Sequence, residues 1–101
     1  MERDELRAIM NFLRQRVQLG SQGEADTEVT IAFNAPSVEQ MAAAGLDPEG
    51  SRRILDAPWW DEMTTDIVET PEMCDPSDSP EQVIEYARDV VSEYIRKRAE
   101  L

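Results

Sequence analysis

Apolar residues near the N-terminus recur with the spacing of an amphipathic helix. Residues 3–19 place one every three or four positions, as one face of an α-helix requires. Gly20 follows directly and is a typical helix end. We therefore predict a helix over residues 3–19. Its apolar stripe consists of Leu6, Ile9, Met10, Leu13 and Val17.

The C-terminal segment, residues 79–101, has the clearest helical pattern in the chain. Ser79 is placed to cap the helix, Pro80 is suited to its first position, and Gln82 completes a capping box. Basic residues at 96–98 favour the negative end of the helix dipole. The predicted core stripe consists of Val83, Ala87, Val90, Val91, Tyr94 and Ile95.

Residues 28–33 alternate larger apolar side chains with smaller or polar ones, which is typical of a short strand with one buried face. The preceding segment, residues 20–26, contains glycine, serine and acidic residues and is predicted to be a loop. A strand needs a hydrogen-bonding partner for its backbone. We expect that partner to be residues 65–70 or the same strand of a second chain, which would make the protein a homodimer.

Three shorter helices are predicted in the middle of the chain. The first two begin with capping residues, and the third begins at a proline, which fits the first helical position. A proline-rich stretch follows and is predicted to be irregular. The predicted helices cover residues 37–45, 47–57 and 58–68, and the irregular stretch covers residues 70–80.

These elements predict a mainly α fold, with α+β as the alternative. A length of 101 residues fits one domain, covering residues 1–101. Long N- and C-terminal helices should pack together, with the short helices and the single strand between them. A chain of this size buries a modest core.

The chain is strongly acidic, with a formal net charge of −12. Residues 54–87 hold ten acidic residues and no basic one, whereas the segments nearest the two ends are close to neutral. This field repels nucleic acids and anionic membranes, so we expect direct binding to neither. Adaptation to salt or to a GC-rich genome also produces such acidity, so the charge alone does not define a function.

The sequence offers little catalytic or metal-binding chemistry. It contains no histidine, the commonest general base and metal ligand. The single cysteine, Cys74, lies between Glu72 and Asp75, whose charges disfavour a reactive thiolate, so we predict a partly buried structural cysteine. The acidic stretch from residue 75 lacks the glycine and the final acid of an EF-hand loop. We expect no catalytic residue, no metal and no cofactor.

The hydropathy pattern bears on the cellular location of the protein. No apolar run approaches the roughly 20 residues that a membrane helix needs. The N-terminal segment is charged and amphipathic, without the apolar centre of a signal peptide. We therefore expect no membrane association and a cytoplasmic location.

The two tryptophans, Trp59 and Trp60, are adjacent, so they cannot share a helix face. Trp60 falls on the stripe with Met63 and Ile67 and is predicted to anchor the core. Trp59 is predicted to lie at the edge of the core, ringed by carboxylates, where an exposed aromatic side chain would suit partner binding. The predicted partner-binding residues are Trp59, Asp61, Glu62, Asp66, Glu69, Glu72, Asp75 and Asp78.

The favoured function is a non-enzymatic protein–protein interaction module that engages a basic partner surface, as an adaptor, an inhibitor or a chaperone-like regulator. One alternative is a DNA mimic that occupies the DNA site of a DNA-binding or defence protein. Another is a small enzyme or ligand-binding domain that uses a carboxylate pair. The first two need an exposed acidic surface, and the third needs a pocket with a carboxylate at its floor.

Overall fold

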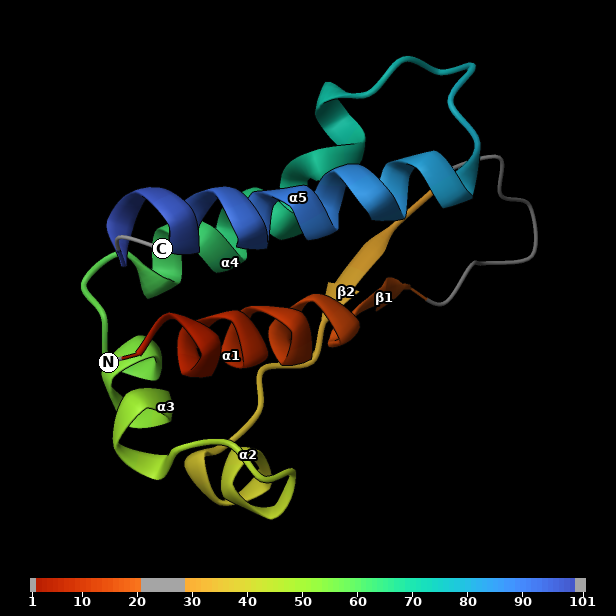
Figure 1. Ribbon diagram of the computed structural model, residues 1–101. Helices are drawn as coiled ribbons and strands as arrows, with labels where there is room; N and C mark the ends of the chain where they lie inside the picture. Colours follow the sequence, from red (N-terminus) through yellow and green to blue (C-terminus); the bar gives the residue numbers. More distant parts are fainter. Residues whose placement is uncertain (1, 21–28, 100–101) are drawn as a thin grey trace.

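The computed structural model describes residues 2–20 and 29–99, and the helices dominate this part of the chain (Figure 1). The mainly α fold with long terminal helices is confirmed. The loop predicted over residues 20–26 lies, apart from Gly20, outside the described residues. In chain order the elements are α1 (Arg3–Gln15), β1 (Val17–Leu19), β2 (Ile31–Phe33), α2 (Val38–Ala43), α3 (Pro48–Leu55), α4 (Trp60–Glu69), the 3₁₀ helix η1 (Thr70–Met73) and α5 (Pro80–Arg98).

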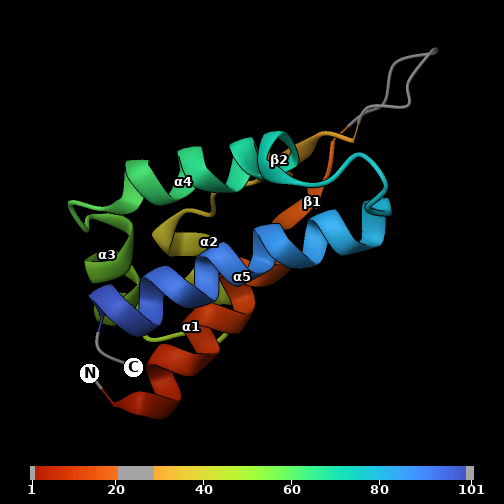
Figure 2. The ribbon, with the colours of Figure 1, turned by 90° about the horizontal axis from the view of Figure 1, so that it is seen from above.

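The two terminal helices run antiparallel and pack side by side, as the sequence predicts (Figure 1). Helix α4 packs against α5 as well, and the chain passes from α4 through η1 and a loop to the start of α5 (Figure 2). Helices α2 and α3 lie on the other side of α1 from α5 (Figure 1). The beginning of α1 and the end of α5 therefore share one end of the molecule.

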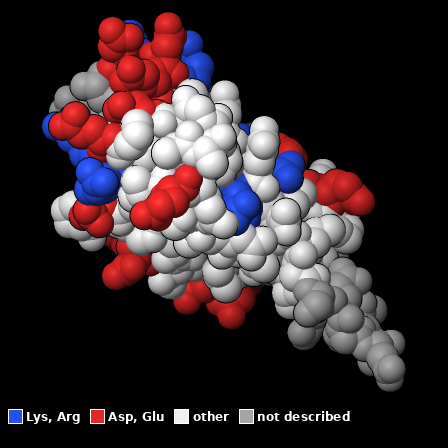
Figure 3. Space-filling model, turned by 90° about the horizontal axis from the view of Figure 1, so that it is seen from below, with Lys and Arg blue, Asp and Glu red and all other residues white. Residues whose placement is uncertain are grey.

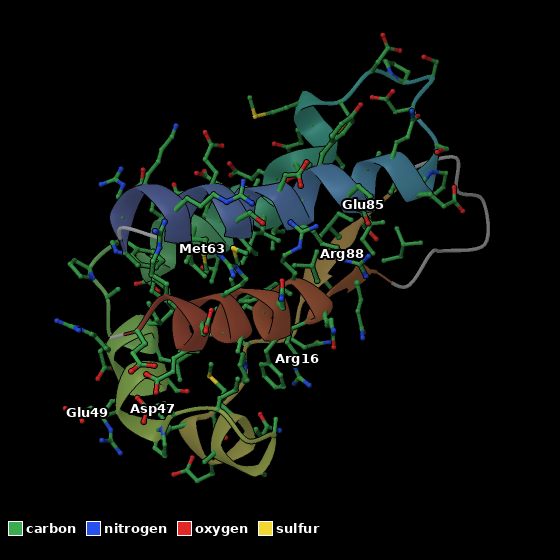
Figure 4. The ribbon with its side chains drawn as sticks, viewed as in Figure 1. Arg16, Asp47, Glu49, Met63, Glu85 and Arg88 are labelled. Carbon is green, nitrogen blue, oxygen red and sulfur yellow. The ribbon has the colours of Figure 1, made fainter. Side chains whose placement is uncertain are left out.

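The core forms where the apolar stripes of α1, α4 and α5 meet. Met63 and Ile67 of α4 are fully buried, and Met63 points between α5 and α1 (Figure 4). The stripes predicted for α1 and α5 supply most of the remaining core, although Val90 and Tyr94 are only half-buried. The other buried apolar residues of these two helices are Leu6, Ile9, Met10, Leu13, Val83, Ala87, Val91 and Ile95.

The strand predicted over residues 28–33 is confirmed for Ile31–Phe33, but the partner predicted within the chain, residues 65–70, is wrong. It pairs antiparallel with Val17–Leu19 of the same chain, with Val17 opposite Phe33. Residues 65–69 belong to α4 instead. Formation of a homodimer, which the second choice implied, stays a prediction.

The same pairing corrects the predicted helix over residues 3–19, because α1 ends at Gln15. Val17 is fully buried in the strand, just as it would be in a helix four positions after Leu13. The apolar pattern therefore fits both structures at this position. Cross-strand hydrogen bonds decide between them: Asn34 N–H donates to the Arg16 carbonyl and Gly20 N–H donates to the Thr30 carbonyl.

The predicted helix ends in the middle of the chain are largely confirmed. The Ser37 and Gln40 side chains form the capping box of α2, and the Asp47 carboxylate accepts the Gly50 N–H at the start of α3. Gly45, after α2, has a φ of 87°, a left-handed conformation that glycine adopts without strain. Ser79 and Gln82 form the same box at the start of α5.

Two boundaries near α4 differ from the prediction. The helix begins at Trp60 rather than at residue 58, because the Trp60 N–H donates to the Ala57 carbonyl and residues 57–60 form a turn. At the other end, Thr70–Met73 is a 3₁₀ helix rather than irregular chain. The Thr70 hydroxyl donates to the Asp66 carbonyl and holds η1 against the end of α4.

A polar network fixes α5 to α1 and β1. The Arg14 guanidinium donates to the Ser92 hydroxyl and lies 3.3 Å from the Asp89 carboxylate and 3.6 Å from that of Glu85. Arg88 donates to the Arg14 carbonyl and lies 3.1 Å from Glu85 (Figure 4). The carboxylates of Glu85 and Asp89 thus form ion pairs with arginines within the fold.

Candidate functional site: an acidic groove on α5

Helix α5 lies beside the segment that runs from α4 through η1 to the following loop (Figure 2). Residues of both line a groove. We call this hollow of ≈ 620 Å³ the acidic groove. The groove follows from the order of the elements: η1 continues directly from the end of α4, and the loop after it leads back to the start of α5. The groove is lined by Asp66, Glu69, Thr70, Met73, Cys74, Asp75, Asp78, Tyr86, Val90, Glu93 and Tyr94.

The apolar part of the acidic groove is unusually exposed. Met73 has 88% of its surface accessible and Tyr86 has 45%, and both line the groove. Tyr86, Val90 and Tyr94 lie four residues apart along one side of α5, next to its core stripe. Large apolar side chains that remain exposed together mark an interaction surface more often than isolated ones do.

The charged side chains that line the groove are all carboxylates: Asp66, Glu69, Asp75, Asp78 and Glu93. The N–H and hydroxyl of Ser77 donate to Asp75 and lower the pKa of that carboxyl. A hydrogen bond and ion pair with Lys97 lower the pKa of Glu93. Both groups are therefore ionised at neutral pH, and Lys97 balances part of the charge of Glu93.

The face opposite to the one seen in Figure 2 carries charges of both signs. In Figure 3, side chains of both signs are distributed around a broad uncharged area.

Tyr94 closes one end of the groove by joining α5 to α4. Its hydroxyl donates to the Asp66 carboxylate, and the ring lies 6.0 Å from that of Trp59. Burial is the main cause that raises the pKa of Tyr94 above its usual 10.0, followed by the hydrogen bond to Asp66 and by the charges of Asp66 and Glu62. Tyr94 is therefore a neutral hydrogen-bond donor over the physiological pH range.

Cys74 lines the groove and is half-buried, as the sequence predicts. Its thiol donates to the Thr70 carbonyl at 3.2 Å. Burial raises the pKa of the thiol, and the nearby Asp78 carboxylate raises it further. The thiolate that nucleophilic chemistry requires is therefore disfavoured.

The structure brings four of the eight predicted binding residues together in the groove: Asp66, Glu69, Asp75 and Asp78. Asp61 and Glu62 are exposed on the first turn of α4, and Glu62 is close enough to affect Tyr94. Glu72 is exposed on η1 but does not line the groove.

The predictions for the tryptophans need correction. Trp59 is half-buried, as expected, but among the described residues the hollow beside it is lined by three arginines and one acidic residue. Trp60 is also half-buried rather than a core anchor, and its ring lies 5.8 Å from that of Phe33. Trp60, the first residue of α4, packs against the core beside Phe33 of β2. Met63, one turn further along α4, is fully buried in the core instead.

Sequence reasoning missed the apolar members of the groove, chiefly Met73 and Tyr86. Met73 lies in a segment that its prolines suggested to be irregular, where periodicity gives no signal. Tyr86 falls outside the core stripe of α5, and that position could have been noticed. An exposed tyrosine on the edge of a stripe is a signal for a surface site, although its neighbours across the groove cannot be inferred from it.

Searches of the described part of the chain and of known proteins add three findings. Across residues 2–20 and 29–99, no three Cys, Asp or Glu side chains are grouped in a way that would hold a metal ion. Among the helices described, none is long and apolar enough to cross a membrane. Comparison with protein-family models, curated proteins and solved structures finds no match to this chain.

Proposed function

We propose that the protein is a non-enzymatic interaction module whose acidic groove binds a basic, amphipathic segment of a partner protein. In this role it acts in the cytoplasm as an adaptor, an inhibitor or a chaperone-like regulator. The observation that carries the proposal is the exposure of Met73 and Tyr86 in a groove whose charged lining is entirely acidic.

The groove suits an occupant with both apolar and basic side chains. Burying Met73 and the Tyr86 ring under a partner would remove apolar surface from water, at roughly 25 cal/mol for each Å² buried. Lysine or arginine side chains of the partner would meet carboxylates at the rim, where charge pairs act mainly on association rate and orientation. Arginine would also find the exposed Tyr86 ring for a cation–π contact.

The other two function classes receive less support from the same residues. A DNA mimic needs carboxylates in the place of phosphates, and an apolar groove floor imitates no part of a DNA backbone. A carboxylate-based enzyme needs a carboxyl group with a raised pKa. The pKa values of Asp75 and Glu93 in the groove are both lowered instead.

Affinity capture with matched variants tests the proposal. Three baits are compared in an extract of the source organism: the wild-type protein, the groove variant Met73→Ser/Tyr86→Ser, and the control variant Leu19→Ser/Val68→Ser. The control also removes two exposed apolar side chains, but these lie outside the groove. The proposal expects a protein with a basic surface that the wild type and the control retain and the groove variant loses.

Salt provides the second arm of the experiment. Retention should fall steeply between about 0.1 M and about 1 M NaCl, because the Debye length falls from roughly 10 Å to roughly 3 Å. Circular dichroism at each salt concentration checks that the protein stays folded. Equal retention by all three baits, or binding that does not change with salt, would contradict the proposal.

A further inference from the structure

The C-terminal end of α5, the beginning of α1 and the turn between α3 and α4 lie together at one end of the molecule (Figure 1). Residues of all three line a second hollow. We call this hollow of ≈ 710 Å³ the arginine hollow. We propose that it binds a small organic anion with an aromatic body. It is lined by Arg3, Leu6, Arg53, Ile54, Asp56, Ala57, Pro58, Trp59, Arg98 and Ala99.

Apolar residues from three parts of the chain contribute to the arginine hollow. Leu6 and Ile54 come from the core and are 4% and 2% exposed. Trp59 and Pro58 come from the turn before α4, and Trp59 is supported by its contact with the Tyr94 ring. An indole that is held from one side and lines a hollow offers a flat surface on which an aromatic ligand can stack.

The hollow gathers basic residues in an otherwise acidic protein. Among the described residues, Arg3, Arg53 and Arg98 line it together with one acidic residue, Asp56. Within the described residues neither Arg53 nor Arg98 makes an ion pair, although Arg98 lies over the Tyr94 ring at 5.9 Å. Guanidinium groups bind carboxylate, phosphate and sulfonate oxygens with charge-assisted hydrogen bonds.

The surroundings limit the charge of the occupant. Arg53 and Asp56 also line a neighbouring hollow that contains Glu5, Asp47 and Glu49. These carboxylates and the net charge of −12 repel an anion in proportion to the charge that it carries. A polyanion such as a nucleic acid is therefore disfavoured, whereas a singly or doubly charged ligand is affected much less.

The size of the hollow fits a small molecule. Pockets for small ligands are typically about 300–1,000 Å³, apolar for the most part, with a few polar groups that orient the ligand. The arginine hollow has a volume in this range, the Trp59 indole in its lining, and arginine and aspartate residues as its polar groups. This inference uses a surface separate from the acidic groove and does not depend on the proposed function.

Anilinonaphthalene sulfonate is the probe for the test, because it is a fluorescent aromatic anion. Its uncharged analogue, phenylnaphthylamine, has the same aromatic body without the sulfonate. We expect one molecule of the anionic probe to bind per chain, and the uncharged analogue to bind at least about tenfold more weakly, since the charge-assisted hydrogen bonds are lost. Equal affinity for the two probes, or no binding of the anion, would overturn the proposal.

Two double variants with the same net charge locate the site. Arg53→Gln/Arg98→Gln removes two arginines of the hollow, and Arg52→Gln/Arg96→Gln removes their neighbours on the same two helices. The first variant should weaken binding about tenfold or more, and the second less than about twofold. All four side chains are exposed, so both variants should fold, and their thermal melts verify this.

Two further arms keep the test specific. The groove variant Met73→Ser/Tyr86→Ser should bind the probe as the wild type does, and loss of binding there would place the probe in the acidic groove and overturn the assignment. Competition with naphthoate and with naphthyl phosphate then identifies the preferred anionic group. Failure of both to displace the probe would also contradict the proposal.

Discussion

Replacing Tyr94 by phenylalanine removes the hydroxyl that links α5 to α4 at the end of the acidic groove and leaves the ring in place. Hydrogen bonds to ionised groups contribute about 1.5–3 kcal/mol to stability. Asp66 is exposed to water, which competes for its carboxylate, so we take a lower value of about 1 kcal/mol for this bond. At neutral pH, Tyr94→Phe should therefore lower the free energy of unfolding by about 1 kcal/mol.

The same contact predicts a pH dependence with a definite sign. The pKa of Tyr94 is higher in the folded protein than its usual 10.0, so folding favours the neutral phenol. This contribution is fully present below pH 10 and is lost as the pH rises further, because the unfolded chain then releases the proton first. The loss amounts to about 1.4 kcal/mol for each pH unit above 10.

Urea unfolding of the wild type and of Tyr94→Phe at neutral pH and near pH 11 measures both effects. The advantage of about 1 kcal/mol that the wild type has at neutral pH should disappear or slightly reverse near pH 11, since only the tyrosine of the wild type has a proton to lose. An Asp66→Asn background serves as the control, because the pair should couple in a double-mutant cycle. A difference that is the same at both pH values would refute the account of this contact.

Three further predictions concern residues outside this contact. Gly45→Ala should lower the free energy of unfolding by about 1 kcal/mol through backbone strain alone, because φ of Gly45 is 87° and the added methyl group meets no atom within 4 Å. Urea unfolding checks this, with Gly45→Asn as a control that should lose less stability. Trp59→Ala and Trp60→Ala should each cost about 2 kcal/mol, since both rings are half-buried and a fully buried one costs about 3–5 kcal/mol; thermal melts that differ greatly between them would contradict this. Cys74 should react with iodoacetamide more slowly in the folded protein than in urea at the same pH, because its pKa is raised, and equal rates would remove the proposed protection.

The sequence predicted those parts of the fold that depend on neighbouring residues. The capping boxes at Ser37 and Ser79 and the glycine stop at Gly45 are local signals, and each occurs where expected. The apolar stripes of the terminal helices were sufficient to predict that these helices pack together. The capping boxes, the glycine stop and the apolar stripes are each visible in a single segment of the sequence.

The features that the sequence did not predict depend on contacts between distant segments. Val17 fits a helix stripe and a buried strand equally well, and only the pairing with Phe33 selects the strand. The surroundings of Trp59 depend on Arg3 and Arg98, which lie at opposite ends of the chain and meet in space. Linear charge runs therefore placed Trp59 among carboxylates, whereas the fold places it among arginines.

The candidate site shows the same division. The acidic run supplied Asp66, Glu69, Asp75 and Asp78, because the whole segment from α4 to the loop is acidic and one side of it lines the groove. The α5 side of the groove was not predicted, since the orientation of α5 relative to η1 is set by the packing of α4 against α5. Binding pockets made by two elements require that relative orientation.

The central claim is that the acidic groove binds basic, amphipathic segments, and an NMR map of binding tests it most directly. Backbone amide shifts of the labelled protein are followed while a peptide of alternating leucine and arginine is added. The account predicts that the largest changes occur at Met73, Tyr86, Val90 and Glu93. Changes spread evenly over the exposed carboxylates, including Asp4 and Glu49 outside the groove, would show attraction by charge alone and would contradict the claim.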